Sequence, residues 1–292
     1  MKKLISESET VLIVTGDDFG ISHAVNEGII QAHREGILTS ASLMVNGRAF
    51  SEAVSMAKNH PRLGVGIHIS LLRSKATLPP EEIPELVDRA GSFPEQPIAA
   101  GFRFFFDRRI RAELEKESDA QIRKFLAAGL VPSHIDGHLH LHIHPVIVEI
   151  LLRLARKYDI PALRLPRESL RVNVRLDPRN LLRNTAYFLI YSFLCRNAER
   201  KFRSHGRVFP DRFFGLMAVG RMNESYLLGL IDRMAPGVTE VGMHPAVFSP
   251  RELEKWAPHY QYRQELEALT SPRVKKKIAT RGIRLANYSA LG

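Results

Sequence analysis

The sequence has a single cysteine, Cys195, among its 292 residues. One cysteine cannot form an internal disulfide, so the thiol content gives no reason to expect an oxidising compartment. Long apolar runs are also missing near the N-terminus, where the run at 11–14 is too short for the core of a signal peptide. We therefore expect a cytoplasmic protein without an export signal.

Acidic residues are scarce relative to basic ones, with 31 Asp and Glu against 42 Lys and Arg and a formal net charge of +11. Such an excess favours contact with polyanions, either nucleic acid or an anionic membrane surface. No aromatic-rich RNA-binding motif accompanies it, so a nucleic-acid partner is not expected. The basic residues cluster at 103–111, 196–207 and 272–284, although a solvated basic surface explains each cluster taken singly.

Strand-like and helix-like patterns alternate along the chain. An apolar run at 11–16 precedes a helical pattern at 21–36, and similar pairs follow to the end. The glycine motif that a doubly wound open sheet needs for dinucleotides is absent. We predict an α/β fold in the form of a (β/α) barrel of about seven or eight units, like a TIM barrel, as one domain over 1–292. An open doubly wound sheet is the alternative.

Two stretches interrupt this alternation. Residues 71–108 are rich in proline and glycine, which indicates a long loop or small insertion over one face. Residues 167–210 contain an apolar segment at 185–195, between Arg183 and Arg196, that is too short to span a bilayer. It is either a buried core helix, apolar on all sides, or an interfacial helix whose flanking arginines meet anionic headgroups.

Polar residues that could act in catalysis or bind a metal follow the predicted strands. The carboxyl ends of parallel strands meet at one edge, where β/α barrels carry their active sites. Polar residues placed at random would not fall so consistently at the carboxyl ends of the strands, so we expect these side chains to converge. They are Asp17, Asp18, His68, Asp136, His138, Arg164 and His244.

Asp17 and Asp18 are adjacent carboxylates, which repel each other when both are ionised. A bound cation relieves that repulsion, and the carboxylate left free is then a natural general base. The alternative is a helix N-cap, because Asp is favoured there and a helical pattern follows. Two carboxylates in succession at a strand end favour the metal.

A run of histidines provides further ligands. One Asp and two His would leave coordination positions open, as in catalytic rather than structural sites. At most two histidines of the run can therefore bind the ion, and the others orient ligands, contact substrate or, as for His144, begin a helix. His68 alone is typical of a core histidine, but beside the acidic pair it becomes a third ligand. The run consists of His134, His138, His140, His142 and His144.

These motifs follow one another as in the YdjC-like carbohydrate deacetylases, which the chain resembles over nearly its whole length. The motifs are TGDDFGIS, NGRAF, VGIHISLL, SHIDGHLHLHIHP, LRLPRE and MHPA. Within that family the stretches FRFFFDRR, LRLPRE and FFGLMAVGRM are most similar to the hopanoid-biosynthesis-associated branch.

The resemblance implies a (β/α) barrel that holds one divalent ion, Zn²⁺ or Mg²⁺, and removes N-acetyl groups from sugars. It implies Asp18, His68 and His138 as metal ligands and Asp17 as the base. His244 is the first candidate for the acid and His140 the second. Arg164, His142 and Asp136 are the candidates for substrate contact, and Arg164 can equally orient Asp17 or serve as a structural ion-pair partner.

The resemblance further suggests that the substrate is an N-acetylglucosaminyl group on a hopanoid-type lipid, reached by peripheral contact with the inner face of an anionic membrane. Deacetylation of soluble N-acetylated (chito-)oligosaccharides is the alternative. A metal-dependent phosphoesterase would need a second carboxylate cluster, which the sequence lacks. An idle barrel that binds lipid or RNA is the remaining rival, and the oligomeric state, a homodimer included, stays open.

Overall fold

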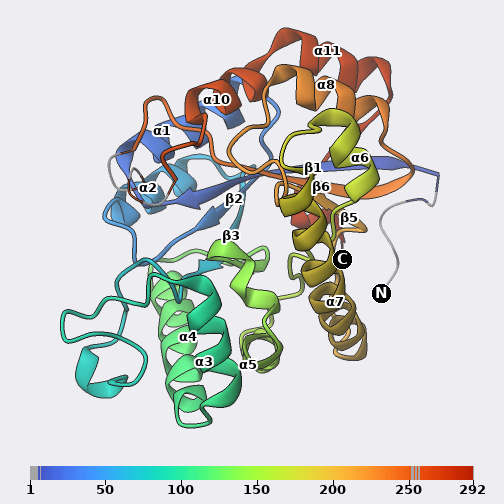
Figure 1. Ribbon diagram of the computed structural model, residues 1–292. Coiled ribbons are helices and arrows are strands. Elements are labelled where there is room, and N and C mark those ends of the chain that lie inside the picture. The colour runs from blue at the N-terminus through green and yellow to red at the C-terminus, as the bar shows by residue number, and fades with distance from the viewer. Residues whose placement is uncertain (1–5, 7, 251–252, 254, 256, 292) are drawn as a thin grey trace.

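A curled parallel sheet forms the centre of the molecule (Figure 1). The computed structural model describes residues 6, 8–250, 253, 255 and 257–291. Within that part of the chain the strand order is β4-β3-β2-β1-β6-β5, with β7 beside the first half of β1, and every strand pair is parallel. The strands are β1 Thr10–Phe19, β2 Ser40–Leu43, β3 Gly64–Ile69, β4 Ile135–Gly137, β5 Arg212–Phe214, β6 Gly237–Met243 and β7 Arg284–Leu285.

Residues 162–166 form only isolated bridges with the sheet. Leu163 bridges to Ile135 of β4, and Ala162 bridges to Val208, just before β5. Pro161 and Pro166 bracket the segment, and a proline has no N–H to donate to a sheet ladder. The α/β prediction with a parallel sheet is confirmed, whereas a closed barrel of seven or eight regular units is not.

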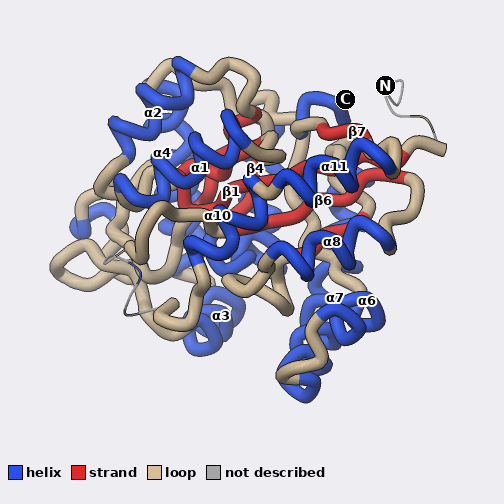
Figure 2. The backbone as a smooth tube through the Cα atoms, turned by 90° about the horizontal axis from the view of Figure 1, so that it is seen from above, coloured by secondary structure: helices blue, strands red, loops and turns tan. Residues whose placement is uncertain are grey.

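Helices surround the strands (Figure 2). Side-chain oxygens cap several of their N-termini, as Ser22 does for α1 and Asn223 for α8. His144 caps α5, whose first residue is proline, so the prediction that His144 begins a helix is confirmed. The covering helices are α1 His23–Glu35, α2 Phe50–Asn59, α4 Ile110–Ala127, α5 Pro145–Lys157, α8 Glu224–Asp232, α10 Tyr262–Thr270 and α11 Pro272–Thr280. Short 3-10 segments are η1 Pro80–Glu82, η2 His138–Ile143 and η3 Tyr288–Leu291.

Both interruptions of the sequence pattern contain helices. The first, predicted as a long loop or small insertion, holds the helix α3, Pro97–Phe106. The second holds α6, Leu170–Leu176, and α7, Leu181–Ser204. Helix α7 exposes several apolar side chains, so it is not a core helix buried on all sides. No helix among the described residues has the length and apolar character needed to cross a membrane.

Candidate metal centre

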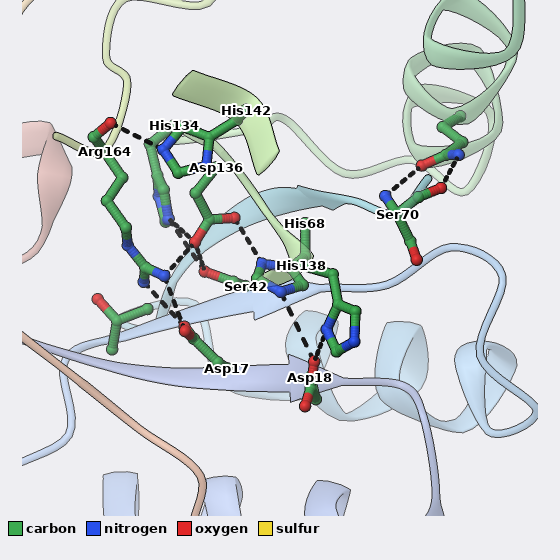
Figure 3. Close-up of polar contacts among 12 residues, drawn as sticks. Asp17, Asp18, Ser42, His68, Ser70, His134, Asp136, His138, His142 and Arg164 are labelled. Atoms are coloured by element: carbon green, nitrogen blue, oxygen red, sulfur yellow. Dashed lines mark hydrogen bonds and ion pairs between the residues drawn. The ribbon is translucent and has the colours of Figure 1, made fainter. Parts of the chain in front are cut away.

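The two aspartates at the end of β1 point in different directions. Asp18 has a left-handed backbone with φ 62°, and the pairing of β1 with β2 shifts register between Gly16 and Phe19. Figure 3 shows Asp17 directed toward Arg164 and Asp18 toward His138. Neither aspartate caps α1, because Ser22 does. The helix-cap alternative is therefore excluded.

Asp18, His68 and His138 form a compact group. Asp18 Oδ1 lies 3.0 Å from His138 Nδ1 and 3.6 Å from His68 Nε2. One ligand atom from each residue lies within 4.8 Å of the others. The group comes from three places: the end of β1, β3, and the residue that follows β4. Parallel strands thus bring together the three residues that the sequence analysis names as ligands.

His68 is held by a carboxylate on its other side. Its Nδ1 is 2.8 Å from Asp136 Oδ1, which leaves Nε2 facing Asp18. Burial would lower the pKa of His68, but the charge and hydrogen bond of Asp136 and the charges of Asp17 and Asp18 raise it to about 9. These surroundings favour bound positive charge, and a carboxylate behind a histidine is the usual support of a histidine ligand.

Arg164 is a buried guanidinium that joins several acidic groups. It makes two hydrogen bonds to Asp17, of 2.7 and 2.8 Å, and lies 2.7 Å from Asp136 Oδ2 and 2.9 Å from Glu240 Oε1. Burial opposes its charge, but these three carboxylates raise the pKa of Arg164 well above its ordinary value. Phe213 lies against it, with the ring centroid 5.2 Å from Cζ. Arg164 is therefore the fixed cation of this cluster.

Glu240 and Tyr288 belong to the same network, and the sequence analysis missed both. Glu240 also accepts hydrogen bonds from Thr15, at 2.8 Å, and from Tyr288, at 2.6 Å. The signal for Glu240 was present, because it is an acidic residue within the otherwise apolar strand β6. Tyr288 follows β7 and stacks on His134, with ring centroids 3.8 Å apart, so His134 has a structural role.

A divalent cation fits this chemistry. Around the cluster the described residues place four buried acidic side chains about one guanidinium, which leaves negative charge to be balanced. One carboxylate with two imidazoles is a donor set that zinc and similar ions accept. The four acidic residues are Asp17, Asp18, Asp136 and Glu240.

The histidines after β4 have separate surroundings because the backbone bends sharply. Leu139 and His140 both adopt φ 55° and ψ 25°, a left-handed conformation that costs about 1–3 kcal/mol for each non-glycine residue. His140 packs edge-on against Phe213, with centroids 5.2 Å apart, and its Nδ1 has no hydrogen-bond partner among the described residues. Burial, with the charge of Arg164, lowers the pKa of His140 well below its ordinary range.

Two further histidines of the run are directed elsewhere. His142 Nε2 lies 3.0 Å from the Arg164 carbonyl, and burial lowers the pKa of His142 to about 4. His144 Nε2 lies 3.1 Å from the Gly101 carbonyl in α3. Among the histidines of the run, His138 is therefore the one that contacts Asp18.

His244 follows β6 on the same edge of the sheet. Its backbone N–H donates to Glu265 Oε2 at 2.7 Å, and its ring lies edge-on to Tyr260, with centroids 5.0 Å apart. Its Nδ1 is buried without a hydrogen-bond partner in the described part of the chain. Burial would raise the pKa of Asp18, but the charge and hydrogen bond of His138 and the charges of His244 and His68 lower it below its ordinary value. Glu265, which fixes this backbone, was not predicted.

Comparison with known proteins gives consistent matches over nearly the whole chain. A family model described as YdjC-like protein matches residues 11–280. Carbohydrate deacetylases from Brevibacillus brevis and Geobacillus stearothermophilus are each 35% identical, covering 96% and 94% of this chain and 99% and 96% of their own lengths. A crystal structure from Enterococcus faecalis, of a protein named for cellobiose-phosphate cleavage, is 32% identical with a TM-score of 0.73, covering 98% of this chain and all of that one.

The ion pairs of Arg164 lead to a prediction about the stability of the fold. Replacing Arg164 by Met (Arg164→Met) leaves three buried carboxylates without their cation, so we expect a loss of about 3–5 kcal/mol in the free energy of unfolding, measured with urea. The matched control is Arg153→Met, which removes an exposed pair with Glu115 and should cost at most about 1 kcal/mol. Equal losses in the two variants would show that the buried cluster does not hold the fold.

Proposed function

This chain belongs to the YdjC-like protein family, and on that basis we propose that it is a carbohydrate deacetylase that removes the N-acetyl group from an amino sugar with one divalent metal ion. The observation that carries the proposal is the convergence of Asp18, His68 and His138 at the carboxyl edge of the sheet, where a second buried aspartate, Asp17, directly precedes Asp18. The identity to carbohydrate deacetylases over 96% of the chain supports the reaction class.

Asp18, His68 and His138 would hold the ion. Two imidazole nitrogens favour Zn²⁺ over Mg²⁺, which prefers oxygen ligands. A bound divalent ion supplies a Lewis acid and lowers the pKa of water. Asp136 is buried and bonded to His68, Ser42 and Arg164, so we assign it to orienting His68 rather than to contact with substrate.

Asp17 is the proposed general base. Both its oxygens accept hydrogen bonds from Arg164, which fixes the direction of the carboxylate. It would take a proton from the water that attacks the acetyl carbon. As the C–N bond breaks, His244 would give a proton to the amine, and acetate and the free amino sugar would leave. Arg164 is thus assigned to positioning Asp17, and the His142 ring in turn lies within hydrogen-bond distance of the Arg164 backbone carbonyl.

His140 is the alternative acid, but its surroundings are less suited to that task. It lies between Phe213 and Tyr191, with ring centroids 5.2 and 6.1 Å away. His244 is better suited because Glu265 fixes its backbone, whereas burial and the charge of Arg164 lower the pKa of His140 well below its ordinary range, which disfavours the protonated form that an acid needs. We therefore keep His244 as the first assignment.

The substrate proposed is lipid-linked, with the chain bound peripherally to an anionic membrane. Helix α7 carries the observation that favours it, because Leu182 and Phe193 are 89% and 72% exposed. Between 180 and 204 five basic residues stand against one acidic residue. Exposed apolar residues flanked by cations are what an interfacial helix needs. We propose an N-acetylglucosaminyl lipid of the hopanoid type as this substrate, and a soluble oligosaccharide is the alternative.

Metal content should depend on each of the three proposed ligands. The variants Asp18→Ala, His68→Ala and His138→Ala should lose metal affinity by at least about 10- to 100-fold. Replacing even a residue that only hydrogen-bonds to a metal ligand typically lowers metal affinity by that much. Elemental analysis after dialysis measures this, with acetate release from an N-acetylglucosamine oligosaccharide as the activity. The exposed His23 gives the control His23→Ala, which should match wild type. Full metal and activity in all three ligand variants would place the site elsewhere.

Asp17→Asn should separate binding from chemistry. The amide keeps the shape of the side chain but cannot accept the proton, so acetate release should fall by roughly 10² to 10⁴-fold while metal content stays at the wild-type level. Turnover within a few-fold of wild type in a metal-replete Asp17→Asn protein would contradict the assignment of Asp17 as base.

Membrane contact by α7 is tested with Leu189→Ser/Phe193→Ser, two exposed positions that leave Phe188, which lines a pocket beside α7, unchanged. Wild type should co-sediment with vesicles of phosphatidylcholine and phosphatidylglycerol, and less so at high salt because exposed charges are screened. The variant should sediment about tenfold less. If wild type ignores these vesicles and deacetylates soluble oligosaccharide as fast as glycolipid, the soluble substrate is the right one.

A further inference from the structure

Helix α3 has an exposed apolar stripe that the proposed function does not use. Phe102 and Phe106 are 63% and 72% exposed, and with Ile98 they stand at four-residue spacing, which places them on one face of the helix. The two rings are stacked, with centroids 6.3 Å apart, and Phe105 packs edge-on to Phe106. Single exposed apolar residues are normal, but a contiguous group of this kind marks an interaction surface.

The other face of α3 is anchored to the protein. Ala100 and Phe104 are buried, and the Gly101 carbonyl lies 3.1 Å from His144 Nε2. The helix is thus fixed in place by one face while its aromatic stripe remains outside. This stripe is not needed to hold the helix.

The charge around α3 selects the class of partner. Between residues 96 and 111 four basic residues stand against one acidic residue. Some are paired locally, as Arg103 is with Glu85 at 3.0 Å, but the local balance stays positive. The composition repeats that of α7: exposed apolar side chains beside an excess of arginine. An anionic surface with an apolar interior complements both helices.

Helices α3 and α7 also flank the segment that carries the metal ligand. His144, at one end of the histidine run, contacts the Gly101 carbonyl of α3. Near its other end, the Tyr191 hydroxyl of α7 lies 3.4 Å from the Leu139 carbonyl. Both helices contact α5, and both views place them on the same side of the molecule (Figures 1 and 2).

We propose that α3 and α7 form one two-helix docking surface for an anionic phospholipid bilayer, with the His138–His144 segment between the two helices. Docking at two places fixes the orientation of the protein, which one helix alone would not do. The metal site then faces amino sugars held at the level of the lipid headgroups. This inference rests on the proposed function and names the surface through which the site would reach its substrate.

The test compares three variants of the full chain on vesicles of phosphatidylcholine with and without phosphatidylglycerol. Phe102→Ser/Phe106→Ser removes the α3 stripe, Leu189→Ser/Phe193→Ser removes part of the α7 face, and Val131→Ser is the control. Val131 is 87% exposed but precedes β4, at the edge of the sheet opposite the site. Flotation measures binding, and urea unfolding confirms that each variant is folded.

We expect each double variant to lose vesicle binding by about tenfold or more, while Val131→Ser binds as wild type does. Acetate release from soluble N-acetylated oligosaccharide should be unchanged in all three. Binding at the wild-type level by a folded α3 variant would overturn the proposal. So would an altered oligomeric state in that variant, measured by light scattering, with vesicle binding intact, because the stripe would then contact a second copy. If wild type itself released no acetate from the soluble oligosaccharide, that result would instead count against the proposed function.

Discussion

The buried guanidinium of Arg164 holds together the parts of the structure on which the site depends. Its three carboxylate partners come from β1, β4 and β6, while Arg164 itself lies between Pro161 and Pro166, where the sheet ladder is incomplete. Side-chain ion pairs therefore join strands at the place where backbone hydrogen bonds are sparse. Burying these charges is costly, and the cost is met only because each has a close partner of opposite sign.

The same guanidinium serves two chemical roles at once. Through Asp17 it directs the proposed base, and through Asp136 it supports His68, a proposed ligand. The base and the ligand are thus not independent groups, because both depend on one cation. Residues that share a partner in this way influence each other beyond the sum of their separate effects.

The sequence predicted the convergence of Asp17, Asp18, His68 and His138 because parallel strands end at one edge, and that rule needs only the positions of the strands. Glu265 and Tyr288 were not predicted because their roles depend on which side chain lies opposite, which no local pattern contains, whereas Glu240 has a local signal as an acidic residue within an otherwise apolar strand. Residues 162–166 form isolated bridges rather than a full strand because Pro161 and Pro166 have no N–H to donate to a sheet ladder. Helix α3 lies in the stretch 71–108, whose proline and glycine content predicted a long loop or small insertion, although proline is well suited to the first turn of a helix, as Pro97 is here.

Strand β1 is made early in the chain, yet its network is completed late. It pairs with β6 and β7, and Thr15 meets Glu240, 225 positions further on. Tyr288 then adds the last hydrogen bond to Glu240. During synthesis on the ribosome, β2 can pair with one side of β1 early, but the side of β1 that pairs with β6 stays without its partner until most of the sequence has emerged. Such distant pairings slow folding and leave an apolar strand open to wrong partners in the meantime.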